Sequence, residues 1–433
     1  MSELSAQLSA ALPENTGVRP EWLKAIREAG AEQFRTHGLP TRKDEAWKYT
    51  GLGLLGQSEV RLATGLKSPA SGKAHPVPLV EPGLQLNLLD GQILEQIGDA
   101  SSGLTVLPLG DALGSGVKGL QGLLESLPVN QTRGASGHGF SALNSATLDS
   151  GVVIHVAAGT DAGRLTLIWF TSQGAKPLLF NSRICVILEE GAKLELLEQF
   201  ESTDDNANTS NIVMQVDLAK QSGLQHIRFQ QESEKSALIT RTEVSQQADS
   251  EYAYFGFDLG GGLVRHDLHT SLLGDGAKSH INGAYLLDGN RHVDNHTRVD
   301  HFAGGGLSDQ YFRGVAGGSG RAVFNTAVCV HPGADETEAR QSNANILLSA
   351  RAEVDTKPEL EIYADEVIAS HGATVGQLDE LAVFYMRSRG LNEQEARQLL
   401  TTAFCKSVSD KLADPALGDV ISQRMMDVMP QAE

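Results

Sequence analysis

Histidine is the side chain whose spacing points most clearly to chemistry in this sequence. Six of the 13 histidines lie between residues 266 and 301: His266, His269, His280, His292, His296 and His301. If residues 292–300 form a strand, alternate side chains share one face, which then carries His292, Asp294, His296, Arg298 and Asp300. Imidazole and carboxylate groups on that face could bind iron or zinc. The alternative is a solvated outer face with paired charges, from which Val293 and Val299 turn inward.

A second histidine of interest is His371, which lies in the run Ala369-Ser370-His371-Gly372-Ala373-Thr374. Its small neighbours would let a backbone or a partner molecule approach closely. The preceding run, Glu359–Glu366, is acidic. A single histidine in a loop is more often structural than functional, so the residues around it do not settle its role.

Other chemical motifs are weak or absent. Residues 51–56 read Gly-Leu-Gly-Leu-Leu-Gly and match GxGxxG, but they follow an expected helix rather than a strand, which argues against dinucleotide binding. The sequence has no GxxxxGK[ST] phosphate-binding motif, no HExxH and no GxSxG. A process that uses ATP would therefore need an ATPase partner.

The three cysteines form no CxxC pair, and an odd, sparse set indicates a reducing compartment. Cys329 lies in the apolar run Ala327–Val330, and Cys405 lies beside an apolar helix face, so we interpret both as packing residues rather than ligands. The N-terminus shows no secretory signal, and no apolar run is long enough to span a membrane. These features predict a soluble, cytoplasmic protein.

The composition excludes some partners. The 433 residues include 35 basic and 54 acidic side chains, a net charge of −19, so the surface should repel nucleic acid and anionic membranes. Glycine is frequent, with 46 residues, but follows no Gly-X-Y period.

The elements that must position these side chains fall into three zones. Residues 1–140 are mixed, with helices expected over 20–37 and Lys43–Tyr49, a loop over 64–82, and short strands between Leu84 and Leu109. Residues 141–370 alternate strand-like runs with turn residues about every 14 positions. Expected strands include Gly151–Val156, Leu165–Thr171, Ile184–Leu188, Leu194–Phe200, Ile212–Leu218 and Leu224–Gln230. Two similar turns, Leu272–Gly276 and Leu286–Asn290, lie 14 residues apart.

So many evenly spaced strands favour a β-solenoid, because a single sheet of more than about ten strands tends to curl or split. Two packed sandwiches are the alternative.

Residues 371–433 are expected to be helical beyond about residue 375. One helix spans Asp379–Arg389 and ends at Gly390, and the next begins at Asn392, with Glu395 completing a capping box. This helical hairpin either covers the open end of the solenoid or docks a partner.

Five segments resemble the SufD-type members of the SufB/SufD family, which belongs to the SUF iron–sulfur cluster assembly system. The segments are Asp44–Thr50, Phe140–Asn144, Asp355–Val367, Ser370–Leu378 and Phe384–Leu391. They occur in the expected order across most of the chain, and the C-terminal segments are the most specific.

The resemblance implies a right-handed parallel β-helix flanked by helical regions. It implies a non-catalytic scaffold subunit that pairs with SufB through the β-helix and binds the SufC ATPase through the C-terminal helices. It also implies a nascent iron–sulfur cluster or iron and a reduced flavin in the complex, and no cofactor bound tightly to the isolated chain. His371 matches the family histidine implicated in cluster assembly. Many relatives carry Cys where this chain has Ala369, so thiolate ligands would come from SufB.

SufC-docking candidates on the hairpin are Phe384, Tyr385, Arg389, Leu399 and Phe404. Without SufB, an exposed β-helix edge would favour a homodimer of the isolated chain. Two other functions stay open from the residues alone. One is a stand-alone metal-dependent β-helix enzyme that uses residues 266–301. The other is a carbohydrate-binding or surface solenoid, which the lack of a secretory signal disfavours.

Overall fold

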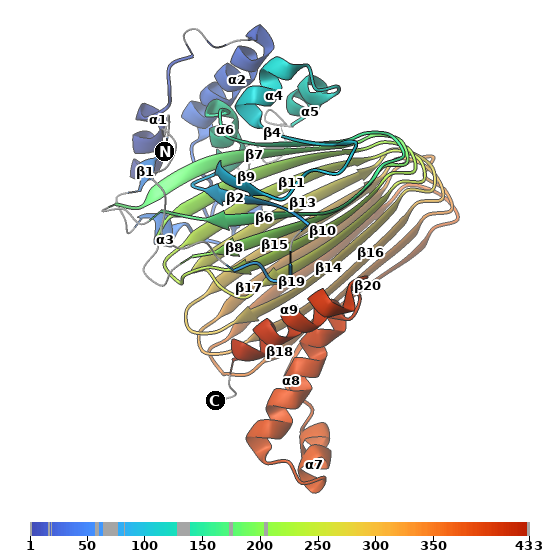
Figure 1. The fold of residues 1–433 in the computed structure, drawn as a ribbon. Coiled ribbons are helices and arrows are strands. Elements are labelled where there is room, and N and C mark those ends of the chain that lie inside the picture. The colour runs from blue at the N-terminus through green and yellow to red at the C-terminus, as the bar shows by residue number, and fades with distance from the viewer. Residues whose placement is uncertain are drawn as a thin grey trace.

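The computed structural model describes residues 2–15, 18, 20–56, 60–63, 77–81, 83–127, 139–172, 176–202 and 207–430. In this part of the chain a long β body carries helices at both ends of the sequence (Figure 1). Most of the loop expected over 64–82 lies outside the described residues.

The β body consists of two sheets, each formed by alternate strands of the chain. The odd sheet contains β5 (Gly151–Val156), β7 (Leu178–Leu188), β9 (Thr209–Leu218), β11 (Ala237–Gln246), β13 (Leu263–Leu272), β15 (His292–His301), β17 (Arg321–Val330) and β19 (Glu353–Ile362). The even sheet contains β6 (Asp161–Phe170), β8 (Lys193–Glu201), β10 (Gly223–Gln231), β12 (Glu251–Asp258), β14 (Lys278–Leu287), β16 (Leu307–Ala316), β18 (Glu338–Leu347) and β20 (Ile368–Gly376).

Each of these strands pairs in parallel with the strand two places along the chain. Leu263 pairs with His292, and His292 pairs with Arg321, so a full coil there takes 29 residues (263 to 292 to 321). One coil therefore holds two of the 14-residue units seen in the sequence. This connectivity confirms the parallel β-solenoid and excludes the two packed sandwiches.

Residue alternation explains why the coils stack. Within β15 and β17, Val293, Val299 and Val328 face inward and join the main apolar cluster between the two sheets. The turns need backbone conformations that favour glycine. Gly276 and Gly289, in the two similar turns, have φ values of 69° and 63° in the left-handed region.

Four short strands from the N-terminal zone join the same sheets. They are β1 (Arg61–Leu62), β2 (Leu84–Leu89), β3 (Gln92–Ile97) and β4 (Leu104–Pro108). β2 pairs in parallel with β6, while β4 pairs in antiparallel fashion with β5. The strands expected between Leu84 and Leu109 are therefore confirmed, and they extend both sheets at the first coil.

The described part of the N-terminal zone also forms six helices and one 3₁₀ turn, which pack on the first coils and along the outer face of the odd sheet. They are α1 (Glu3–Ala10), α2 (Glu21–His37), η1 (Glu45–Trp47), α3 (Gly53–Gly56), α4 (Leu109–Ser115), α5 (Leu120–Glu125) and α6 (Gly139–Ala146). The helix expected over 20–37 is confirmed as α2. The prediction of a helix over Lys43–Tyr49 was wrong. That segment forms the 3₁₀ turn η1 instead, and Trp47 packs in a buried apolar cluster.

Packing of α2 against α6 depends on Gly30, because a Cβ there would lie only 2.8 Å from the Ala142 carbonyl oxygen. All of α6 is buried, and the Asn144 side chain donates hydrogen bonds to the carbonyl oxygens of Ser182 on β7 and Asn211 on β9. The Phe140–Asn144 segment thus fastens the helices to the odd sheet.

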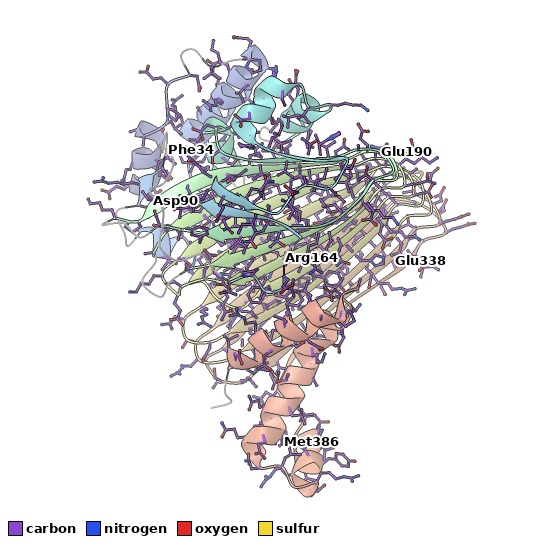
Figure 2. The ribbon with its side chains drawn as sticks, viewed as in Figure 1. Phe34, Asp90, Arg164, Glu190, Glu338 and Met386 are labelled. Atoms are coloured by element: carbon purple, nitrogen blue, oxygen red, sulfur yellow. The ribbon has the colours of Figure 1, made fainter. Side chains whose placement is uncertain are left out.

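At the other end of the chain lie α7 (Glu380–Ser388), α8 (Glu393–Ser409) and α9 (Pro415–Asp427). The capping box of Asn392 and Glu395 is confirmed, and α9 is a further helix that was not predicted. Arg164 on β6 pairs with Asp414, the N-cap residue of α9, at 2.6 Å and so ties this helix to the solenoid (Figure 2). Met386 on α7 lies near the tip of the arm that projects from the body (Figure 2). None of the described helices is long and apolar enough to cross a membrane.

Candidate functional site at the open end of the solenoid

His371 lies on β20, the last strand of the even sheet, which among the described residues pairs with β18 alone. It stands opposite Gln341, and Ala369 stands opposite the buried Ala339. Because alternate residues share a face, His371 and Ala369 occupy register positions that point inward in the preceding coils. No further described coil covers them, so the imidazole is exposed.

A ladder of buried polar side chains leads through the solenoid interior to this position. Thr297 and Thr326 of the odd sheet both donate hydrogen bonds to the Gln310 side-chain oxygen, and Gln341 donates to the Thr326 hydroxyl at 3.2 Å. Gln310, Gln341 and His371 occupy successive rungs of the even sheet. His371 is thus the exposed end of an internal polar row, and its imidazole can bind a metal that also has ligands from another molecule.

The chain around His371 leaves space for such a partner. A Cβ added at Gly372 or at Gly376 would meet no atom within 4 Å. Four apolar side chains of the last coil are exposed: Ile362, Tyr363, Ile368 and Val375. We call β19 and β20, with the residues between them, the open end.

The outward side of β19 is acidic. Its exposed or half-buried side chains include Glu353, Asp355, Glu359 and Glu361. Lys357 pairs with Glu359 at 2.6 Å, and it also lies 3.5 Å from Glu45 of the N-terminal segment. The open end therefore combines unpaired strand edges, apolar side chains and negative charge.

The helical arm of α7 and α8 follows the open end after three residues, 377–379. Its exposed side chains include Phe384, Tyr385 and Leu399, which are 69%, 54% and 47% exposed. Arg389 donates a hydrogen bond to the Tyr385 hydroxyl, and its guanidinium lies 5.2 Å from the ring centre. Phe404 is different, because it packs against the apolar cluster that joins α8 and α9 to the even sheet.

The six histidines of residues 266–301 do not converge. His266 and His301 are buried at inward positions, whereas His269, His292 and His296 lie on the outer face of the odd sheet, and His280 lies on β14 of the even sheet. Burial lowers the pKa of His292 to about 4 and places the pKa of His266 well below its usual value, so both rings are neutral at pH 7. Val293 and Val299 point inward as expected.

The expectation of a solvated outer face was wrong for Asp294, which is 1% exposed. The N-terminal segment covers it: the Thr50 hydroxyl donates to Asp294 and bonds with His292 at 2.8 Å, and Trp47 stacks on Arg265 at 4.2 Å. We call these five residues the covered flank.

Charge pairing holds the covered flank together. Arg265 forms a buried ion pair with Asp294 and also donates to the Ala46 carbonyl oxygen. Burial alone would raise the pKa of Asp294, but the Arg265 guanidinium and His296 outweigh it and hold that pKa below its usual value. The Asp44–Thr50 motif thus acts here as a structural clamp, and the groups of His292 and Asp294 are already engaged by protein partners.

A cavity of about 1020 Å³ adjoins the covered flank. Its lining includes Arg42, Gly51, Gly53, Glu232 and Arg291. Gly53 begins the short helix α3, which follows a 3₁₀ turn, so the GxGxxG run does not lie between a strand and a helix.

Sequence reasoning missed one group of side chains. Asp300, Cys329 and His331 come together on the outer face of the odd sheet. His331 was not among the predicted site residues, and Cys329 was predicted to be a packing residue rather than a ligand. The available signal was the spacing Cys-Val-His at 329–331, because two residues apart on a strand means the same face.

The geometry defines a class of protein: a two-sheet parallel β-solenoid with N-terminal helices packed on its first coils, an open last coil and a projecting helical arm. Residues 170–404 match the family model described as SUF system FeS cluster assembly, SufBD core domain.

The chain is 31% identical to the iron–sulfur cluster assembly protein SufD of Escherichia coli K12, over 97% of this chain and 99% of that protein. It is 30% identical to the chloroplastic protein ABCI7 of Arabidopsis thaliana, over 96% of this chain and 86% of that protein. It is 29% identical to a SufBD family iron–sulfur cluster assembly protein of Synechocystis, over 92% of this chain and 89% of that protein. The chain therefore belongs to the SufB/SufD family of iron–sulfur cluster assembly proteins.

Proposed function

We propose that this chain is the SufD-type scaffold subunit of a complex with SufB and the SufC ATPase, and that it is not itself an enzyme. The observation that carries the proposal is the open end, where β19 and β20 each pair with a single neighbour among the strands that the structure describes. Unpaired strand edges and exposed apolar side chains support pairing with the β-helix of a second subunit. When SufB is absent, the same edges would pair two copies of this chain.

His371 is the residue of this chain that contacts iron or the nascent cluster at that interface. Its exposed ring ends the internal polar ladder, and an imidazole can replace a thiolate on one iron of a cluster. Ala369 offers no ligand atom, so thiolates come from SufB. Reduced flavin binds the assembled complex rather than a site formed by this chain alone.

The arm of α7 and α8 docks SufC. Leu381 and Phe384 are 77% and 69% exposed, and a hollow of about 490 Å³ lies beside Phe384, Arg387 and Leu391. Because three residues join α7 to β20, a movement of the arm driven by ATP would reach the strand that carries His371. Tyr385, Arg389 and Leu399 complete the contact.

Co-purification tests the docking surface. Phe384→Glu should abolish recovery of SufC with the complex and leave SufB bound, because an exposed apolar anchor becomes a charge. Leu273→Glu is the matched control, since Leu273 is 43% exposed but lies after β13, away from the arm. Undiminished SufC recovery with Phe384→Glu would refute this part of the proposal.

Anaerobic reconstitution of the complex tests His371. His371→Ala should lower the iron and sulfide content of the purified complex while SufB and SufC stay bound. Unchanged cluster content would remove His371 from assembly.

The second candidate, a stand-alone metal-dependent enzyme that uses residues 266–301, loses its support because Arg265 and Thr50 already bind the Asp294 carboxylate.

A further inference from the structure

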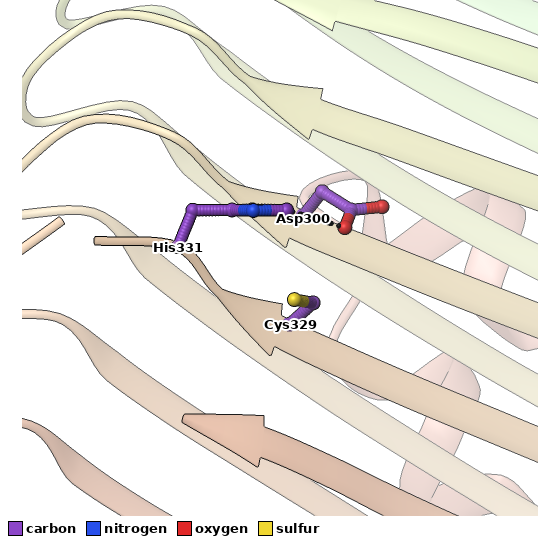
Figure 3. A group of neighbouring side chains, drawn as sticks. All are labelled: Asp300, Cys329 and His331. Carbon is purple, nitrogen blue, oxygen red and sulfur yellow. Dashed lines mark hydrogen bonds and ion pairs between the residues drawn. The ribbon is translucent and has the colours of Figure 1, made fainter. Parts of the chain in front are cut away.

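Three side chains with different donor atoms meet on the outer face of the odd sheet, on the strands that precede β19. Asp300 on β15, Cys329 on β17 and His331 just after β17 place one oxygen, one sulfur and one nitrogen within 4.8 Å of one another (Figure 3). Across the part of the chain that the structure describes, no other group of three such residues converges this closely. His371 lies on the even sheet, so this group is separate from it.

The fold itself enforces the convergence. Asp300 and Cys329 are register partners on neighbouring strands, and His331 shares the outward face of Cys329 because it lies two residues further on. The His331 ring stacks on Phe302 with ring centres 4.1 Å apart and planes 11° apart. That stacking directs Nε2 of His331 toward Oδ1 of Asp300, at 2.9 Å.

The group is reachable from solvent although two of its members are buried. Cys329 is 3% exposed, whereas the His331 side chain is 31% exposed and forms the accessible side. A thiolate, an imidazole and a carboxylate together form the donor set that proteins use for zinc and for iron(II).

A fourth donor is available on the next strand. Glu361 of β19 is the register partner of Cys329, and its carboxylate accepts a hydrogen bond from the thiol. The Glu361 carboxylate lies outside the group of three donor atoms that meet within 4.8 Å. If its side chain turned toward them, four protein donors would complete a tetrahedral site. Metal binding would replace the covalent S–H bond of the Cys329 thiol with a sulfur–metal bond and release one proton to solvent.

The positively charged side chain of Arg298 is bonded to the Asp300 carboxylate in the structure. Arg298 makes two hydrogen bonds to Asp300, from Nε to Oδ2 at 2.6 Å and from Nη2 to Oδ1 at 2.7 Å. Its side chain is 44% exposed, so it can turn toward solvent when a metal ion enters. His269, itself bonded to Glu243 at 3.0 Å, bonds Oδ2 of Asp300 at 2.7 Å and would hold the carboxylate from behind.

We propose that Asp300, Cys329 and His331, with Glu361 as the fourth ligand, form a binding site for a divalent transition-metal ion, and that Arg298 is its displaceable counter-ion. The site belongs to the chain alone and needs neither a partner nor His371. It stands whether or not the proposed function is correct.

Cobalt(II) titration of the full-length chain, reduced and under anaerobic conditions, tests the site. A thiolate-to-cobalt charge-transfer band should grow in the near ultraviolet, saturate at one ion per chain, and disappear when zinc is added. Cys329→Ser should abolish the band, and His331→Gln should weaken binding while the thiolate band is retained. Arg298→Met should tighten binding by about tenfold, because it removes a competing positive charge.

Cys405→Ala is the matched control. Cys405 is a buried thiol in the cluster beneath the C-terminal helices, away from this group, and its replacement should leave the band unchanged. Circular dichroism of each variant shows whether it is folded. The proposal is overturned if the wild-type chain gives no band, if the band survives Cys329→Ser in a folded variant, or if Arg298→Met weakens binding.

Discussion

The covered flank and the open end are formed by strands of the same sheets, yet their side chains have opposite environments. At the covered flank, the N-terminal segment closes over Arg265 and Asp294, and both are 1% exposed. At the open end, β20 has no described neighbour beyond β18, and most of its residues are exposed. The difference shows that the coil repeat sets the backbone, while the segment lying against each coil decides whether its polar side chains are structural or free to meet a partner.

The largest expected effect comes from breaking the ion pair of the covered flank. Arg265→Met leaves the Asp294 carboxylate buried without its guanidinium, which should lower the free energy of unfolding by about 3–5 kcal/mol. Arg321→Met is the control nearer the open end, where Arg321 pairs with Glu353 and Asp355 while still partly exposed. Arg321→Met should lower the free energy of unfolding by only about 0–1 kcal/mol. Urea unfolding compares the two, and equal losses would contradict the distinction.

The next effect concerns Glu232, which lines the cavity beside the covered flank. Burial raises the pKa of Glu232 to about 7, and the bond from Gln230 and the Arg228 charge offset this only in part. The folded state therefore keeps a proton that the unfolded state loses near its ordinary pKa. The free energy of unfolding is therefore highest below about pH 4.5. It falls by roughly 3 kcal/mol as the pH rises to about 7, because the unfolded chain loses this proton first.

Glu232→Gln removes this titration, so the variant should lose that part of the pH dependence. Urea unfolding at pH values from 4.5 to 8 measures it. An identical decline in the variant and the wild-type chain would show that Glu232 is ionised throughout this range.

The smallest effect compares two rungs of one ladder. Gln341 is 5% exposed and donates to Thr326, so Gln341→Ala should destabilise the fold by about 1–3 kcal/mol. His371, the next rung, is exposed, and His371→Ala should change stability by less than about 0.5 kcal/mol. Thermal unfolding checks both. A large loss for His371→Ala would mean that the ring supports the last coil rather than meeting a partner.

Several local features followed directly from the sequence because they depend on short-range chemistry. The helix of residues 20–37, the capping box at Asn392 and Glu395, and the strand at Gly151–Val156 all appear as expected. The spacing of turns near 14 residues predicted the solenoid because one strand and one turn make half a coil. The helix expected over Lys43–Tyr49 failed because burial of Trp47 against Phe140 and Arg265 decides that segment.

By itself, the sequence determined the repeat, the inward alternation of Val293 and Val299, the acidic charge and the family resemblance, since each is written in residue type and spacing. Only the tertiary structure decided what each outward side chain meets. It placed Thr50 against Asp294 across 244 positions of the chain, and Asp300 beside Cys329 and His331 across one coil. The physical reason is that the residues on the outer face of a strand do not specify which distant segment of the chain will pack against them.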